Sequence, residues 1–512
     1  MQIRERSRTE YTILNVATGT FGYAINTILG FLCRMVFVQC LSADYLGING
    51  LFTNVLTMLS LAELGVGNAI VYALYQPLAK RDEKKIASLM QFYRRAYQAI
   101  GIFVGIIGIS LLPVLKFIIR EVPDTNENIY ILYLIHLGNT VLTYFFSYRG
   151  SLLTADQRGY LVMGIHYIIT VIQSILQIVV LFWTKNYVAY LAIQTMGTFL
   201  YGCLISYAAV KGYPYIIKNK KEKLSKEEQK KLFSNVRDLT IYKVSGLLVN
   251  STDNILITFF QGIALTGIAS NYTLLVTTLN SLLGQIFNGL TASVGNYNAI
   301  EEKERKVELF YFLNLMNFWI FGWASIGIII CSSDLVRWCF GGEYVLPIKI
   351  PLIMAANFYT VGLMNAVWTY KHTMGIFYYG RWIQIATGII NIIASVWLGQ
   401  KYGLFGIFAA TLLARACTNL WYDPYVIFHH GFGISPLLYA KKYMVYGMIF
   451  LLTSVVCYVS TSWINATTIY GLIEKIALCS LLTNVVFFFS FFQTAEFQKL
   501  RSVVRNVCHI IS

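Results

Sequence analysis

Apolar residues run through this chain in long stretches, each of a length that suits a helix across a bilayer. Such a helix needs about 20 mostly apolar residues, whereas a barrel strand would alternate strictly over about ten, and no stretch alternates in that way. Because backbone groups in lipid must satisfy one another, the pattern predicts an all-α polytopic membrane protein with 14 transmembrane helices. The expected spans lie near 14–38, 46–75, 96–119, 129–150, 161–184, 187–210, 239–261, 266–296, 307–331, 350–370, 382–400, 403–423, 443–461 and 469–492.

The composition agrees with a membrane protein and excludes several other classes. Hydrophobic residues make up 57% of the 512 residues, charged residues only 12%, and the mean hydropathy is +0.59. Soluble proteins carry about 25% charged residues, so this chain could not cover a water-facing surface. A disordered chain and a disulfide scaffold are excluded by the same figures. The nine cysteines form no Cys-x-x-Cys pair and are expected as small apolar core residues.

The net charge of +16 has two interpretations. The basic residues could form a nucleic-acid-binding surface, or they could be concentrated in the loops on one side of a membrane. With a cytoplasmic N-terminus, 30 of the 40 Lys and Arg residues fall in cytoplasmic segments, seven in outer segments and three inside spans. This asymmetry predicts cytoplasmic N- and C-termini, and no nucleic-acid partner is expected. The basic stretch 211–238 is expected as a cytoplasmic linker beside anionic lipid headgroups.

The sequence also repeats itself at a shift of about 220 residues. Leu46-Gly47-Ile48 matches Thr266-Gly267-Ile268, and Lys84-Lys85-Ile86 matches Arg305-Lys306-Val307. The repeated unit contains six spans. Because six is an even number, the second copy enters the membrane from the same side as the first. The two copies are therefore parallel, and the axis that relates them lies along the membrane normal. We therefore expect two six-helix lobes followed by an extra helix pair. The predicted divisions are 1–210 for the N-terminal lobe, 211–238 for the linker, 239–440 for the C-terminal lobe, 441–492 for the helix pair and 493–512 for a cytoplasmic tail.

Charged side chains inside apolar spans are costly and are therefore the first candidates for function. Arg34 lies in the first span on a polar stripe, and span seven carries a matching stripe with Asp253 at nearly the equivalent height. We expect the two stripes to line a central cleft between the lobes. Arg34 and Asp253 either pair with each other or act separately on a substrate or ion. The residues expected in a substrate cavity are Arg34, Asn26, Lys243, Asn250, Asn254 and Arg415.

Glu63 lies within the second span, on a polar strip with Asn49, Thr53 and Thr57. A buried carboxyl group holds a proton more readily than an exposed one, so Glu63 could exchange a proton or bind a sodium ion. A carboxylate hydrogen-bonded to its own helix is the alternative. Glu63 and Asp253 are therefore candidates for coupling to an H⁺ or Na⁺ counter-ion or for pairing the lobes. No catalytic residue, cofactor or resident metal is expected, because no phosphate-binding Gly-rich loop or His-Glu-x-x-His motif occurs.

Four longer runs of residues resemble the sequence of a known protein family. They are Leu46-Gly-Ile-Asn-Gly-Leu-Phe-Thr-Asn54, Leu59-Ser-Leu-Ala-Glu-Leu-Gly-Val-Gly-Asn-Ala-Ile70, Thr252-Asp-Asn-Ile-Leu-Ile257 and Tyr422-Asp-Pro-Tyr425. In these runs the chain resembles the bacterial polysaccharide flippases for O-antigen and capsule repeat units, members of the multidrug/oligosaccharidyl-lipid/polysaccharide exporter superfamily. The resemblance covers about residues 10–435, whereas spans thirteen and fourteen match only in hydrophobicity.

The resemblance implies a transporter rather than an enzyme. It would move undecaprenyl-diphosphate-linked oligosaccharide units from the inner to the outer leaflet of a bacterial cytoplasmic membrane, by alternating access, for surface polysaccharide such as lipopolysaccharide or capsule. Its partners would be the lipid-linked oligosaccharide, membrane lipids and other membrane proteins of polysaccharide assembly. Two alternatives stay open. One is a cation-coupled multidrug exporter of the same fold, which normally has twelve spans; the other is a membrane polysaccharide polymerase, which usually needs a sizeable outer loop.

Overall fold

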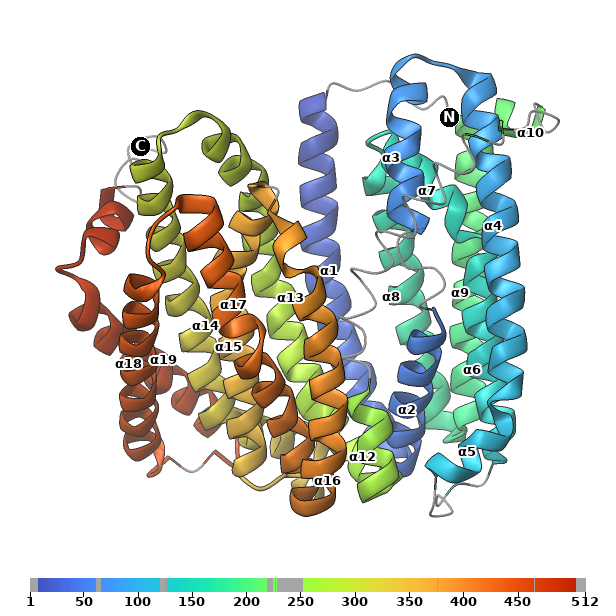
Figure 1. The fold of residues 1–512 in the computed structure, drawn as a ribbon. Helices are drawn as coiled ribbons and strands as arrows, with labels where there is room; N and C mark the ends of the chain where they lie inside the picture. The colour runs from blue at the N-terminus through green and yellow to red at the C-terminus, as the bar shows by residue number, and fades with distance from the viewer. Residues whose placement is uncertain are drawn as a thin grey trace. The chain divides into compact units, whose positions relative to one another are not determined.

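The computed structural model describes residues 8–60, 66–119, 125, 127–218, 224–225, 227, 252–374, 376–464 and 466–502. Every regular element within these ranges is helical, so the all-α prediction is confirmed for the described part of the chain (Figure 1). Each of the predicted spans overlaps at least one of these helices. The chain divides into two compact units, residues 1–267 and 268–512. The predicted linker boundaries stay a prediction, because residues 228–251 lie outside the described ranges.

Unit 1 is a bundle in which α1 packs along α8, α8 packs along α9, and α6 packs between α4 and α9 (Figure 1). Several of its helices begin at a side-chain cap: Asp82 accepts a hydrogen bond from the amide of Lys85, and Asn186 accepts one from Ala189. The helices are α1 Arg8–Cys40, α2 Ala43–Leu59, α3 Val66–Ala79, α4 Glu83–Ser110, α5 Leu112–Ile118, α6 Ile129–Tyr144, α7 Ser147–Ala155, α8 Gly159–Thr184, α9 Tyr187–Gly212, α10 Tyr215–Lys218 and α12 Asp253–Gln261.

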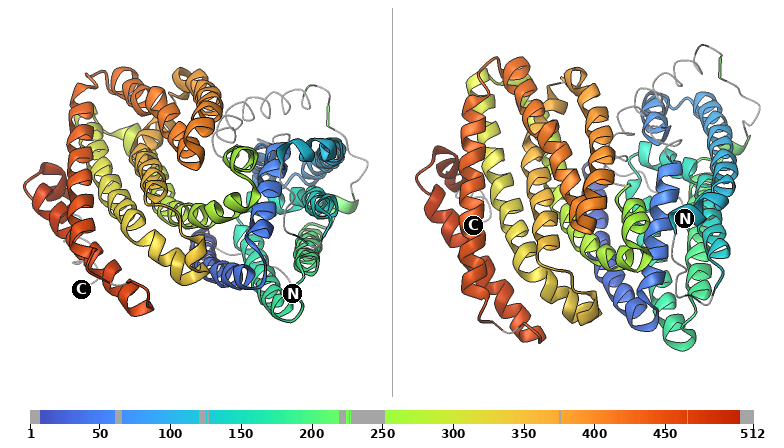
Figure 2. Two further views of the ribbon diagram at one scale, coloured as in Figure 1. Left: turned by 90° about the horizontal axis from the view of Figure 1, so that it is seen from below. Right: turned by 60° about the horizontal axis from the view of Figure 1, so that its bottom comes forward.

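Unit 2 is built around α14, which packs against α15, α18 and α19 (Figure 2). The ring of Phe318 is fully buried in this core and lies 4.6 Å from the ring of Tyr446 and 4.8 Å from that of Phe487, so aromatic contacts join α14 to the last two helices. The helices are α13 Ile263–Ile300, whose first five residues belong to unit 1, α14 Lys303–Phe340, η2 Gly342–Tyr344, α15 Lys349–Thr373, η3 Phe377–Gly380, α16 Arg381–Cys417, α17 Asn419–Val426, η4 Ile427–Phe432, α18 Leu437–Thr461 and α19 Ile469–Phe491.

Large apolar side chains also cover the outer faces of the helices. Leu452 on α18 and Phe489 on α19 are among many that are mostly exposed, as lipid-facing residues would be. Nine helical segments in the described part of the chain are long and apolar enough to cross a membrane. One of them, 382–432, contains two predicted spans. The backbone of Gly403 leaves the helical region there (φ 58°, ψ −137°) and separates the predicted spans 382–400 and 403–423.

A pair of glycines gives the predicted repeat a structural counterpart. A Cβ atom at Gly47 of α2 would lie 2.0 Å from the carbonyl oxygen of Ile263, and one at Gly267 would lie 2.2 Å from that of Ala43. Gly47 and Gly267 are equivalent under the 220-residue shift, and so are Ala43 and Ile263. Positions that are equivalent under the shift therefore meet at one helix crossing, which lies within unit 1.

Ion pairs gather at the two ends of unit 2. At one end Lys499 pairs with Glu308, and Lys442 pairs with Glu496. At the other end Asp334 contacts both Arg337 and Lys475. The predicted orientation of the chain in the membrane stays a prediction.

At one end of unit 1, Asp156 lies between Arg158 and the hydroxyl of Tyr213. Burial and that hydrogen bond raise the pKa of Tyr213, so the phenol stays protonated and donates.

Candidate functional site

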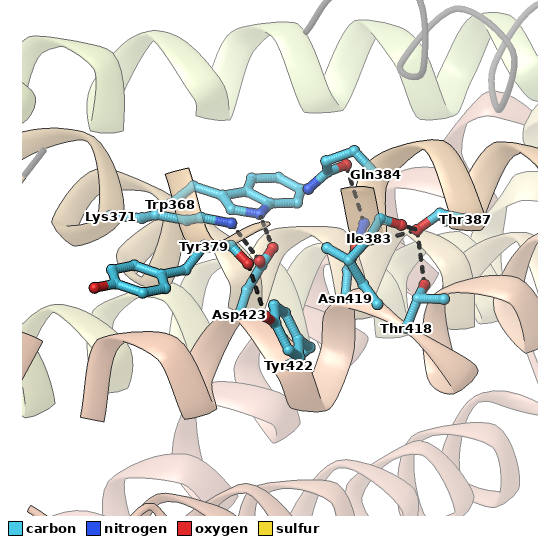
Figure 3. Close-up of polar contacts among 10 residues, drawn as sticks. All are labelled: Trp368, Lys371, Tyr379, Ile383, Gln384, Thr387, Thr418, Asn419, Tyr422 and Asp423. Atoms are coloured by element: carbon cyan, nitrogen blue, oxygen red, sulfur yellow. Dashed lines mark hydrogen bonds and ion pairs between the residues drawn. The ribbon is translucent and has the colours of Figure 1, made fainter. Parts of the chain in front are cut away.

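A buried ion pair lies where α15 ends and α17 begins. The ammonium of Lys371 lies 2.5 Å from Oδ1 of Asp423, and both side chains are buried (Figure 3). The indole nitrogen of Trp368, one turn earlier on α15, donates to Oδ2 of the same carboxylate at 3.1 Å. Both oxygens of Asp423 therefore have a donor. This matters because a buried charge without a partner is strongly destabilising.

The loop between α15 and α16 closes over this pair. A Cβ atom at Gly380 would lie 2.1 Å from the Lys371 nitrogen, so a larger residue there would displace the ammonium from its present position. The hydroxyl of Tyr422 donates to the carbonyl oxygen of Tyr379 at 2.7 Å and holds the same loop from the α17 side (Figure 3). The ion pair is thus enclosed by fixed protein groups.

A second set of polar contacts lies at the junction of α16 and α17. The hydroxyl oxygens of Thr387 and Thr418 lie 2.8 Å apart, and Thr387 also lies 3.1 Å from Oδ1 of Asn419. The amide nitrogen of Asn419 donates to Oε1 of Gln384 at 3.3 Å (Figure 3). This set and the set of Lys371, Asp423 and Trp368 are separate, and we call the two together the polar seam of unit 2. The first set joins α15 to α17 and the second joins α16 to the start of α17, so each fixes the helices that it joins.

Arg415, predicted in the substrate cavity, lies half-buried on α16. One of its guanidinium nitrogens donates to Oδ1 of Asn357 on α15 at 3.3 Å, and the amide of Asn357 donates to the carbonyl oxygen of Phe408 at 2.9 Å. The guanidinium therefore has a contact within unit 2. A role of Arg415 toward a substrate stays a prediction.

The predicted residues of unit 1 lie on two helices. Arg34 and Asn26 are on α1, and both are half-buried; Arg34 lies within electrostatic range of the hydroxyls of Tyr187 and Tyr190. In the described part of the chain, Oδ1 of Asn26 is buried without a hydrogen-bond partner.

Asp253 and Asn254 form the first turn of α12, next to α2. A Cβ atom at Gly50 of α2 would touch the amide nitrogen of Asn254 at 3.4 Å. The predicted sites Glu63, Lys243 and Asn250 lie outside the described residues. The substrate and ion roles of all these residues stay predictions.

Unit 1 contains a cavity of about 350 Å³ that the sequence did not indicate. Hydroxyl groups on its wall come from Thr143 and Ser147, Thr154 and Thr198, and no charged side chain of the described chain lines it. Each of these four hydroxyls donates to a carbonyl three or four residues before it in the chain. The oxygens remain available as acceptors, which suits a neutral ligand rich in hydroxyl groups.

The sequence also missed the pairing of Lys371 with Asp423. In the sequence, Lys371 is only one of the many basic residues on the predicted cytoplasmic side, and Asp423 is only part of the run Tyr422-Asp-Pro-Tyr425. The available signal was an acidic residue inside that family-like run with a lysine at the end of an apolar span. Within the described chain, no group of three or more His, Cys, Asp or Glu side chains could hold a metal ion.

Comparison by sequence finds no relatives: no protein-family model and no curated protein matches the chain. Comparison by structure finds similar proteins. The lipid II flippase MurJ, in an inward closed conformation, matches with a TM-score of 0.67 at 14% identity, over 94% of this chain and 100% of that chain.

Multidrug resistance MATE family transporters of the MOP superfamily match as well. An inward-facing one has a TM-score of 0.56 at 13% identity, over 77% of this chain and 91% of its own. An outward-facing one has a TM-score of 0.50 at 13% identity, over 81% and 98%. The chain therefore has the fold of these membrane transporters.

Proposed function

We propose that this protein is a flippase that carries undecaprenyl-diphosphate-linked oligosaccharide units from the inner to the outer leaflet of a bacterial cytoplasmic membrane. It would act by alternating access, the mechanism expected for transporters built from two repeats. The product would serve surface polysaccharide such as O-antigen or capsule. An H⁺ or Na⁺ gradient is the proposed driving force, with Glu63 or Asp253 as the coupling carboxylate.

The observation that supports a lipid-linked substrate best is the extent of the likeness to a lipid II flippase. The match covers 94% of this chain. The residues outside the match are fewer than the residues of α18 and α19 together, so these two helices cannot both be missing from it. The multidrug transporter likenesses cover 77% and 81%. The extra helix pair is thus matched, at least in part, in a protein named for a lipid-linked substrate.

The chemistry of the described residues is compatible with this substrate. The uncharged, hydroxyl-lined cavity of unit 1 suits sugar hydroxyls, and cationic groups inside apolar helices, such as Arg34, suit a diphosphate. The exposed apolar faces of the helices leave the polyprenyl chain free to stay in lipid.

A cation-coupled multidrug exporter is the second candidate. It is favoured by the likeness to an inward-facing multidrug transporter, which includes 91% of that chain. A drug exporter binds lipophilic cations. The predicted spans of this chain contain three basic residues, Arg34, Lys243 and Arg415, which suit an anionic ligand instead. Opposite ligand charges make the two candidates separable by experiment.

We suggest depleting the protein in its native host and extracting the lipid-linked oligosaccharides. A flippase should leave complete repeat units on the inner leaflet, where an impermeant glycan-labelling reagent does not reach them in intact cells. Re-expression of the wild-type protein should restore labelling. Single units that accumulate on the outer leaflet would instead indicate a polymerase. Unchanged glycolipids together with increased sensitivity to lipophilic cations would indicate a drug exporter.

A further inference from the structure

A second cavity lies at the end of unit 2 where α13 ends, α14 begins and α15 ends. Its volume is about 410 Å³, within the range of small-ligand pockets. Its wall includes Asn298, Lys303, Lys306, Thr373 and His430, and we call it the basic pocket. It is separate from the polar seam and from every residue proposed above for substrate or ion.

The described wall of the basic pocket carries two ammonium groups and no carboxylate. The ammonium of Lys303 contacts one acceptor, the carbonyl oxygen of Gly433 at 3.3 Å, and an ammonium has three hydrogens to donate. Lys306 has no acidic partner in the described part of the chain. The neighbouring Glu301 is held by Arg305 at 3.0 Å, and no carboxylate among the described residues lines the pocket. Such a wall attracts an anion.

The backbone and rings around the pocket are held in place. Residues 427–432 form a turn of π-helix, η4, which ends at Gly433 in the left-handed conformation with φ of 62°. Turns of this kind are frequent at functional sites. The ring of His430 stacks on Tyr379, with centroids 4.1 Å apart and planes within 5°. The π-helical turn and this ring contact support the side of the pocket that carries His430.

Asn298 adds a second, independent sign of a ligand. Its side chain is only 8% exposed, and its amide nitrogen donates to the hydroxyl oxygen of Thr373 at 2.8 Å. Its carbonyl oxygen Oδ1 is buried and has no donor in the described part of the chain. A buried acceptor without a donor is costly, so a turn of this amide toward the pocket would be favoured by a ligand that supplies a hydroxyl or amine hydrogen there.

We propose that the basic pocket binds a phosphate ester that also carries free hydroxyl groups. Lys303 and Lys306 contact the phosphate oxygens, and Oδ1 of Asn298 accepts from a hydroxyl of the same molecule. Two sources share this chemistry: the headgroup of a glycerol phospholipid in the adjacent leaflet, and a soluble sugar or glycerol phosphate. The site is independent of the transported substrate, so it can be tested whether or not the proposed function holds.

The test uses the full-length protein in phosphatidylcholine nanodiscs, with the melting temperature as readout because a ligand of the folded state raises it. One arm replaces part of the lipid by phosphatidylglycerol or by phosphatidylmethanol, which has the same charge and no hydroxyl. The other arm adds glycerol 3-phosphate in solution. The variants are K303Q/K306Q, N298A, and the control K441Q/R501Q, which removes the same charge from exposed residues outside the pocket.

Wild type should be stabilised by phosphatidylglycerol or by glycerol 3-phosphate, and whichever arm responds identifies the source. K303Q/K306Q should weaken the apparent affinity about tenfold, as loss of charged hydrogen bonds does, whereas K441Q/R501Q should keep it. N298A should lose the preference for phosphatidylglycerol over phosphatidylmethanol if the ligand is a lipid. The proposal is overturned if neither ligand stabilises wild type, or if K303Q/K306Q and K441Q/R501Q behave alike.

Discussion

At the scale of single residues, the Lys371–Asp423 pair joins α15 to α17 through two buried charges. Asp423→Asn leaves the buried Lys371 ammonium without its counter-charge, and breaking a buried pair in this way costs about 3–5 kcal/mol. We expect a clear drop in the melting temperature of the purified protein. The double variant K371M/D423L, which buries no charge, should recover most of the loss.

The exposed pair Lys499–Glu308 joins a lysine and an acidic residue at the same end of unit 2 and serves as the matched control. Glu308→Gln should cost under about 1 kcal/mol, because exposed ion pairs contribute little. If D423N were as stable as the wild type, or if K371M/D423L were as unstable as D423N, the pair would not act as described.

Arg34 is the residue on which the proposed substrate binding depends most. Arg34→Ala should lower the flux of lipid-linked oligosaccharide about tenfold or more, the effect of losing a charged hydrogen bond, while membrane abundance stays unchanged. Arg34→Lys should restore part of the flux. The exposed Arg305 offers a control, and Arg305→Ala should leave the flux unchanged. Normal flux in R34A would remove Arg34 from the site.

Glu63 tests the proposed coupling. In Glu63→Gln the side chain can no longer exchange a proton or carry a charge toward sodium. If Glu63 couples transport to either ion, the dependence of flux on the pH or sodium gradient should vanish while a residual flux persists. A gradient dependence identical to that of the wild type would leave Asp253 as the remaining carboxylate to test.

At the scale of helices, the reciprocal crossing of α2 with the start of α13 makes a symmetric prediction. A Cβ at Gly47 or at Gly267 would collide with backbone and not with a flexible side chain. Each of Gly47→Ala and Gly267→Ala should therefore destabilise the protein by about 1–3 kcal/mol. The double variant should lose less than the sum, because either methyl already widens the same crossing.

Gly447 on α18 provides the control for these glycine variants. A Cβ there meets nothing within 4 Å, and alanine favours a helix over glycine. Gly447→Ala should thus be neutral or slightly stabilising in the same unfolding measurement. Unequal losses for G47A and G267A would argue against a symmetric crossing.

The helices could largely be predicted from the sequence because lipid demands long apolar runs, and each run overlaps helices of the structure. The predicted spans 46–75, 96–119 and 129–150 each cover parts of two helices, so helix ends inside a run were not predicted. The break at Gly403 followed from the short gap between two runs. The Lys371–Asp423 pair could not be predicted, since it joins residues 52 positions apart whose meeting depends on tertiary packing. The same holds for Asn298 and Thr373, 75 positions apart in the basic pocket. Periodicity describes single helices and does not give the contacts between them.

At the scale of the whole molecule, the fold and the candidate substrate rest on different kinds of support. The helical fold matches a lipid II flippase and multidrug transporters at 13–14% identity, a level at which architecture persists while ligand contacts differ. The lipid-linked oligosaccharide comes instead from the sequence resemblance, the extra helix pair and the polar groups inside apolar helices. The decisive measurement therefore concerns the substrate.

That measurement is translocation in proteoliposomes. The purified protein is reconstituted with an undecaprenyl-diphosphate oligosaccharide whose glycan carries a fluorophore, and an impermeant quencher reports the fraction that reaches the outer leaflet. The proposed function predicts that quenching exceeds the level in protein-free vesicles, and that R34A lowers this excess while R305A does not. Quenching at the protein-free level in vesicles that do accumulate a lipophilic cation would contradict it.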